Sequence, residues 1–143
     1  MSYLRRLQRS LALVLVGCVA GVTLAAHHSF AVFDHTQSVT VRGTVTKFQW
    51  TNPHGFLEVD YLAADRTTKR FTIELTSINM LARAGWNSRS IKAGEQVTAI
   101  VAPLLSGEPG GLLLEVTLSD GRTLTSPVPG ANTFKRTPEK ELK

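Results

Sequence analysis

The chain has 143 residues, of which 43% are hydrophobic, and this is enough for one domain with a packed core. Its net charge of +5 includes Arg5, Arg6 and Arg9, and the rest of the chain carries 13 basic against 11 acidic side chains. So small an excess, without a basic cluster, argues against a nucleic-acid partner. The single cysteine, Cys18, excludes an intramolecular disulfide.

The first 25 residues have the three zones of a secretory signal peptide. Basic residues open the segment, and the apolar stretch from 11 to 22 is too short to span a membrane. Small residues before Ala26 predict cleavage after Ala25 and an exported protein, periplasmic or secreted. Cleavage after Ala26 is an alternative, in which Leu24 fits the small-residue pattern less well.

A lipoprotein box is a second interpretation of this segment, with Cys18 as the residue that carries the lipid anchor. The apolar run before Cys18 is short, and residues 19–26 stay apolar where a polar tether is typical, so simple cleavage is favoured. The predicted regions are a signal peptide at 1–25, an N-terminal arm at 26–37, a β-barrel domain at 38–125 and a disordered tail at 126–143.

The arm shows no periodicity, and we expect Phe30 and Phe33 to anchor it to the barrel. The first long strand then follows, rich in Val and Thr. Val39, Val41 and Val45 share one face of this strand. Phe48 and Trp50 belong to the other face. A change of face requires a β-bulge or a sharp coil, and Gly43 is the natural place for one to begin.

The order of the remaining elements predicts an OB-fold. A short helix over 78–84 is expected, capped by Ser77 and closed by Gly85. Three strands, a helix and two strands form the five-stranded, partly open barrel of that fold. A small sandwich is the alternative, but it would not need the helix. The strands are predicted over residues 38–50, 56–63, 69–75, 96–103 and 112–118, with a short sixth strand over 122–125. Alternation places Leu57, Val59 and Tyr61 on the inward face of the second strand, and Phe71, Ile73 and Leu75 on that of the third.

Histidines are the candidate metal ligands. Cleavage after Ala25 would leave an N-terminus that begins Ala-His-His, where the amine, two amides and the His28 imidazole form a nitrogen set that suits Cu(II). Cleavage after Ala26 would instead make His27 the first residue, with its own amine and imidazole as ligands. His54, in the turn between the first two strands, can contribute because an OB-fold uses that loop for ligands.

A second interpretation gives the histidines no metal. His27 and His28 are then polar residues of the arm, and His54 is a turn residue that hydrogen-bonds a carbonyl or carboxylate, with Glu74 as a candidate. This interpretation is favoured because no complete set of well-spaced protein ligands is visible.

Four further residues are candidates for a ligand-binding face: Trp50, Asn52, Glu74 and Trp86. Exposed tryptophans on an OB face can stack on a base or a sugar. Burial as core or lid residues is the favoured interpretation, because the basic groove of stacking modules is missing. No catalytic motif is found, and Glu58 and Asp60 are expected to form a solvent face.

Several segments together resemble one family of small exported bacterial proteins that is known only as a domain of unknown function. The resemblance covers residues 26–124 and rests on these motifs: Ala26-His27-His28-Ser29-Phe30, Phe33-Asp34, Gly43-Thr44-Val45, Trp50-Thr51-Asn52-Pro53-His54, Glu74-Leu75-Thr76-Ser77, Leu81-Ala82-Arg83-Ala84-Gly85-Trp86 and Gly94-Glu95-Gln96-Val97. It implies a periplasmic, barrel-like domain of Gram-negative bacteria and brings no established activity, cofactor or site.

The sequence therefore predicts an exported OB-like module that binds a ligand, with copper as the sharpest candidate. The alternative is a structural or protein-interaction domain of the cell envelope without a small ligand. An enzyme is the least favoured class.

Overall fold

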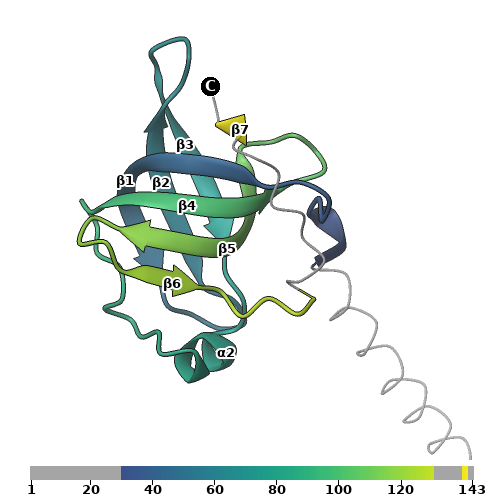
Figure 1. Cartoon of the computed structure of the whole chain (residues 1–143), viewed down its shortest axis with the longest axis vertical. Helices are drawn as coiled ribbons and strands as arrows, with labels where there is room; N and C mark the ends of the chain where they lie inside the picture. Colours follow the sequence, from purple (N-terminus) through teal and green to yellow (C-terminus); the bar gives the residue numbers. More distant parts are fainter. Residues whose placement is uncertain (1–29, 131–139, 142–143) are drawn as a thin grey trace, which may run out of the picture. The chain divides into compact units, whose positions relative to one another are not determined.

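The computed structural model describes residues 30–130 and 140–141 (Figure 1). Contacts divide the chain into two units, Met1–Val32 and Phe33–Lys143. In the first unit the described residues form one short 3-10 helix, η2 (Phe30–Val32). The predicted signal peptide, His27 and His28 lie outside the described residues.

The second unit is a closed β-barrel with the strand order of an OB-fold. Strands β1, β2 and β3 form an antiparallel meander, β5 joins β3 in parallel, and β4 pairs with both β5 and β1. The circle closes because β1 also pairs with β2, which confirms the predicted five-stranded barrel. The elements are β1 (Val39–Gln49), β2 (Phe56–Leu62), β3 (Thr68–Glu74), α2 (Ile78–Arg83), β4 (Gln96–Pro103), β5 (Gly110–Leu118), β6 (Thr123–Thr125) and β7 (Lys140–Glu141).

Alternating side chains fill the barrel. Leu57 and Val59 of β2 are fully buried, as are Phe71 and Ile73 of β3, and this confirms the predicted inward faces of the two strands. Each such side chain stabilises the fold by roughly 1.5–3 kcal/mol relative to an exposed one. The core therefore holds the sheet that carries the candidate sites.

Strand β1 changes its inward face, as predicted, but the bulge does not lie at Gly43. The register with β2 shifts between Val45 and Lys47, so Thr46 is the extra residue. Gly43 instead allows the backbones of β1 and β2 to come close together. A Cβ atom there would overlap the Asp60 carbonyl oxygen and lie 2.8 Å from Val59 Cγ1. The glycine is thus needed for the close approach of β1 to β2.

The helix between β3 and β4 packs across one end of the barrel (Figure 1). Its predicted cap is confirmed, since the Ser77 hydroxyl accepts a hydrogen bond from the Met80 amide. Leu81 is fully buried and belongs to the core, together with Trp86 beyond the helix. Gly85 has φ +89°, the left-handed conformation that ends a helix.

Both flanks of the barrel show packed residues. Phe33 is buried and pairs with Leu104, as expected for an anchor. Residues Ser126 and Val128 are also buried, so the packed chain runs beyond the predicted start of the disordered tail at 126. The Ser126 amide donates to the Leu114 carbonyl, which extends the pairing of β5 with β6.

The last described residues form β7, which pairs in parallel with the start of β1. Residues 131–139 and 142–143 of the predicted tail lie outside the described part. None of the helices within the described ranges is long and apolar enough to cross a membrane.

Candidate functional site

The first candidate site is the first-loop corner, which we define as the loop at 50–55 together with Glu74. The His54 imidazole Nδ1 contacts the Glu74 carboxylate, and each side chain keeps 23% of its surface exposed. Pairing of Phe56 with Glu74 brings the start of β2 beside the end of β3 and so positions this contact. The structure confirms the expectation that His54 bonds a carboxylate.

The two tryptophans do not form an exposed stacking face. Trp86 is only 3% exposed, and its indole Nε1 donates to the Thr125 carbonyl at 3.1 Å. Trp50 is half-buried against the core. Both rings lie near Phe48, at centroid distances of 6.1 Å for Trp50 and 6.5 Å for Trp86. The burial of Trp86 agrees with its favoured interpretation as a core residue, and Trp50 packs against the core from a half-buried position.

Asn52 is exposed and precedes a cis peptide bond to Pro53. Within residues 30–130 and 140–141, no three His, Cys, Asp or Glu side chains lie close enough together to hold a metal ion. Of the seven residues that the sequence singled out, the structure brings His54 and Glu74 into contact and gathers the tryptophans around Phe48. His27 and His28 stay untested.

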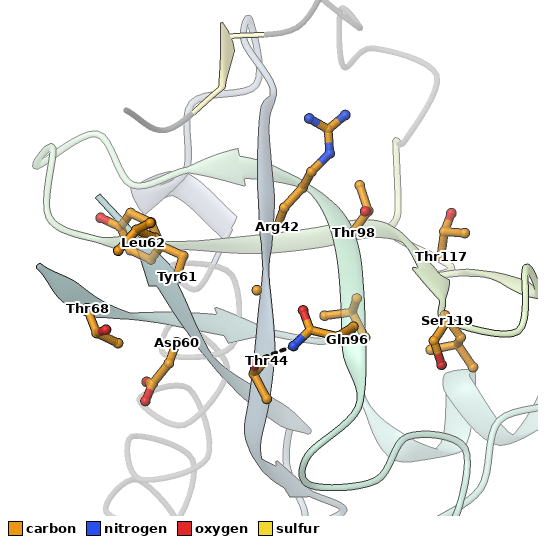
Figure 2. Close-up of a pocket in the computed structure, with 13 residues that line it drawn as sticks. Arg42, Thr44, Asp60, Tyr61, Leu62, Thr68, Gln96, Thr98, Thr117 and Ser119 are labelled. Atoms are coloured by element: carbon orange, nitrogen blue, oxygen red, sulfur yellow. Dashed lines mark hydrogen bonds between the residues drawn. The ribbon is translucent and has the colours of Figure 1, made fainter. Parts of the chain in front are cut away.

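The second candidate site is a hollow at the opposite ends of β2 and β3. It has a volume of about 570 Å³ and lies where β1 crosses between the β2–β3 hairpin and the β4–β5 pair (Figure 2). We call it the Gly43 depression. It is lined by Arg42, Gly43, Thr44, Asp60, Tyr61, Leu62, Thr68, Gln96, Val97, Thr98, Thr117, Leu118 and Ser119.

Hydroxyl and amide groups dominate the polar lining. The Gln96 side-chain amide donates to the Thr44 hydroxyl at 2.6 Å, a bond that joins β4 to β1 (Figure 2). Thr98 and Thr117 face each other across β4 and β5. Because these side chains project from paired strands, their positions are fixed by the barrel and not by a mobile loop.

The one carboxylate in the lining is held by a neighbouring strand. Arg70 of β3 donates to both oxygens of Asp60, at 2.9 and 3.3 Å. This hydrogen bonding, with the attraction of the guanidinium, holds the pKa of the Asp60 carboxyl below its usual value despite partial desolvation. Arg70 also reaches Glu58 at 3.2 Å, so the expected solvent face of β2 is a paired charge cluster.

Sequence reasoning did not single out the Gly43 depression. A signal was present, because Arg42 and Thr44, Gln96 and Thr98, and Thr117 and Ser119 alternate with apolar residues on their strands. Alternation predicts an outward face, but it does not show that three such faces border one hollow. Strand register supplies that information, and register follows from the closed barrel.

Comparison with protein families shows which family the chain matches. The model of a family of unknown function (DUF6152) matches residues 14–115. The chain belongs to this family. The match confirms the resemblance seen in the sequence, and it spans β1 to β4, the first-loop corner and most of the Gly43 depression. No curated protein and no solved structure gives a significant match.

This DUF6152 member has two candidate sites, which differ in their chemistry. The first-loop corner offers an imidazole oriented by a carboxylate, an arrangement suited to metal ligation or to a purely structural hydrogen bond. The Gly43 depression offers donors and acceptors around a hollow, an arrangement suited to binding a small polar molecule.

Proposed function

We propose that this chain is an exported periplasmic module that binds a small ligand on its barrel. The observation that carries the proposal is the Gly43 depression, whose volume of about 570 Å³ is in the range of small-molecule sites. Its lining comes from all five strands of the barrel, which gives a preformed site. The depression lies at the end of the barrel away from the 50–55 and 104–109 loops, where OB-folds bind ligands, so the hollow itself carries the proposal.

Export follows from the predicted signal peptide at 1–25. The test is to express the full-length chain in a Gram-negative host, separate the periplasm from the cytoplasm and sequence the amino terminus of the purified protein. A periplasmic protein that begins at Ala26 supports the proposal. A cytoplasmic protein that begins at Met1 contradicts it, and a blocked terminus with a lipid on Cys18 contradicts simple cleavage.

Ligand binding is tested on the same periplasmic protein by nuclear magnetic resonance. The small-molecule fraction of a periplasmic extract is added after removal of metals, and amide shifts are mapped on the barrel. Shifts at Thr44, Gln96 and Thr98 support binding in the Gly43 depression. An unchanged spectrum favours the alternative function, a structural or protein-interaction domain of the cell envelope.

Binding of Cu(II) is a second candidate function, and the first-loop corner favours it. Ligating histidines commonly bond a carboxylate through the ring nitrogen that does not hold the metal, and Glu74 contacts His54 in this way. The main nitrogen set in this proposal is N-terminal. After cleavage before Ala26 it comprises the free amine, the following amides and the His28 imidazole, with His27 as the first residue if cleavage is one position later.

Calorimetric titration with Cu(II) tests this second function on untagged protein from the periplasm. The controls are a peptide with the same first residues and the variants His28→Ala and His54→Ala. Loss of binding in His28→Ala supports the N-terminal set, and weaker binding in His54→Ala supports a contribution from the barrel. An affinity no higher than that of the peptide contradicts any contribution from the barrel.

A further inference from the structure

We infer that the Gly43 depression binds a neutral polyhydroxylated ligand, that is, a saccharide. The inference rests on the proposed binding function and names the chemical class of its ligand. Three properties of the lining lead to it: the abundance of hydroxyl groups, the balance of charge and the pairing of polar with apolar surface.

Hydroxyl groups form the largest chemical class in the depression. Six of its 13 lining residues carry one: Thr44, Tyr61, Thr68, Thr98, Thr117 and Ser119. A hydroxyl both donates and accepts hydrogen bonds, and the hydroxyls of a sugar do the same. The carboxamide of Gln96 adds a further donor and acceptor. Such a lining matches a ligand whose polar groups are of mixed character more closely than one that only accepts or only donates.

The charges of the lining balance. Arg42 contributes one positive charge and Asp60 one negative charge, and Arg70 from outside the lining already holds the Asp60 carboxylate. Phosphate and nucleic-acid sites require concentrated positive charge, which this lining lacks. A neutral ligand therefore fits better than an anion.

Polar positions in the lining are held in place before a ligand arrives. The bond from Gln96 to Thr44 fixes the Gln96 amide and uses one lone pair of the Thr44 hydroxyl, whose own proton points elsewhere. Threonine is branched at Cβ and therefore has few rotamers, so Thr98 and Thr117 lose little freedom on binding. Ordered side chains reduce the entropy cost of holding a flexible, many-hydroxyl ligand.

An apolar wall faces the hydroxyls. Tyr61 and Leu62 lie on one side of β1, whereas Thr98, Thr117 and Ser119 lie on the other (Figure 2). Leu62, which is 69% exposed, supplies the apolar surface of this wall, whereas the preceding Tyr61 faces the other side of β2, where its ring packs edge-on against Phe71 at 6.3 Å. A sugar ring has C–H faces as well as hydroxyl edges, so it can cover the apolar wall while its hydroxyls meet the polar wall.

The test is a titration of the ¹⁵N-labelled periplasmic protein with neutral oligosaccharides, using maltotriose, cellotriose and N,N′,N″-triacetylchitotriose as probes. Saturable shifts of the amides of Thr44, Gln96 and Thr98 with at least one probe are expected. The variant Thr98→Val keeps the shape of the side chain and removes its hydroxyl, so it should weaken that binding about fivefold, the effect of one hydrogen bond. Thr40→Val, on β1 but outside the lining, should leave the affinity unchanged.

The outcomes separate this inference from the function on which it rests. If inorganic phosphate or the metal-free periplasmic extract shifts these amides and no oligosaccharide does, the ligand class is wrong and the binding function stands. If neither the extract nor any probe shifts them, both fail. Oligosaccharide binding that Thr98→Val and Thr40→Val weaken equally would place the sugar elsewhere and overturn the assignment.

Discussion

The two candidate sites lie at opposite ends of the β2–β3 hairpin, and their polar side chains have different surroundings. At the first-loop corner, His54 contacts Glu74 and the nearby tryptophans pack around Phe48. At the Gly43 depression, hydroxyls from several strands surround a hollow. The side chains of the first site pack against one another and the core, whereas those of the second border an open hollow.

A single strand produces this difference. In β1, Gly43 has no side chain at the point where the backbone must approach Asp60, and it is one of the residues that line the depression. Three residues later the bulge at Thr46 turns Phe48 and Trp50 toward the core. Two local features of one strand therefore separate the hollow, which is the proposed binding surface, from the packed end of the barrel. The following substitutions test that division.

The largest effect is expected for Trp86→Ala, which removes a buried ring from the packed end. Trp86 is 3% exposed and bonds Thr125, so its loss should lower the free energy of unfolding by about 3–5 kcal/mol. Urea denaturation monitored by circular dichroism measures this loss in the free energy of unfolding. Trp50→Ala, at a half-buried ring, is the matched comparison and should cost clearly less. Equal losses would show that the packed end does not depend on the burial of Trp86.

The second effect tests the close approach of β1 and β2. Gly43→Ala places a methyl group against the Asp60 carbonyl and Val59, and it should cost about 2–3 kcal/mol in the same denaturation experiment. Gly85→Ala is the control, because its added Cβ meets no atom within 4 Å and only the φ of +89° is strained. That change should cost about 1 kcal/mol. A smaller loss for Gly43→Ala than for Gly85→Ala would contradict the assigned role of Gly43.

The third effect concerns the pair at the first-loop corner. His54 and Glu74 are partly exposed, so a double-mutant cycle with His54→Ala and Glu74→Gln should give a coupling of about 1 kcal/mol or less. The pair would then orient His54 without being a main source of stability. A coupling of several kcal/mol would instead identify the corner as a structural centre of the fold.

The smallest effect is expected for the pH dependence of stability, through the titration of Asp60 in the lining of the depression. The hydrogen bonds from Arg70 depress the pKa of Asp60, so Arg70→Met should return that pKa toward its usual value, as measured by NMR of the carboxyl carbon. A depressed pKa stabilises the fold above the pKa of the unfolded chain, near 4, and this contribution is lost as the pH falls through the folded value. The wild type should therefore lose more stability than Arg70→Met below about pH 4.

The control for that experiment is Lys69→Met. Lys69 pairs with Asp65 in the adjoining turn, so its removal should leave the titration of Asp60 unchanged. If both substitutions moved the Asp60 titration equally, the shift would come from the general charge of the hairpin and not from its contact with Arg70.

Much of the barrel was predictable, because local patterns specify it. Alternation gave the inward faces of β2 and β3, Ser77 marked the helix start, and the change of parity between Val45 and Phe48 required a bulge. The position of the bulge was not predictable. Glycine is favoured at bulges and at close backbone contacts alike, and only the pairing with β2 shows that Gly43 serves the contact while Thr46 forms the bulge.

Of the two candidate sites, one could be predicted from the sequence and the other could not. The contact between His54 and Glu74 could be anticipated from a turn histidine and a strand-end carboxylate. The Gly43 depression could not, since Thr44, Gln96 and Thr117 are far apart in the sequence and meet only through the register of three strands. Burial of Ser126 and Val128 was also missed, because the Pro- and Gly-rich composition after them favoured disorder.

The claim that ligand binding belongs to the Gly43 depression is tested most directly by one amide-shift map. The protein is purified from the periplasm and titrated with the metal-free small-molecule fraction of a periplasmic extract. We predict shifts that concentrate at Thr44, Gln96, Thr98 and Thr117 and leave the loop at 50–55 unchanged. Shifts confined to His54 and its neighbours, or an unchanged spectrum, would contradict that claim.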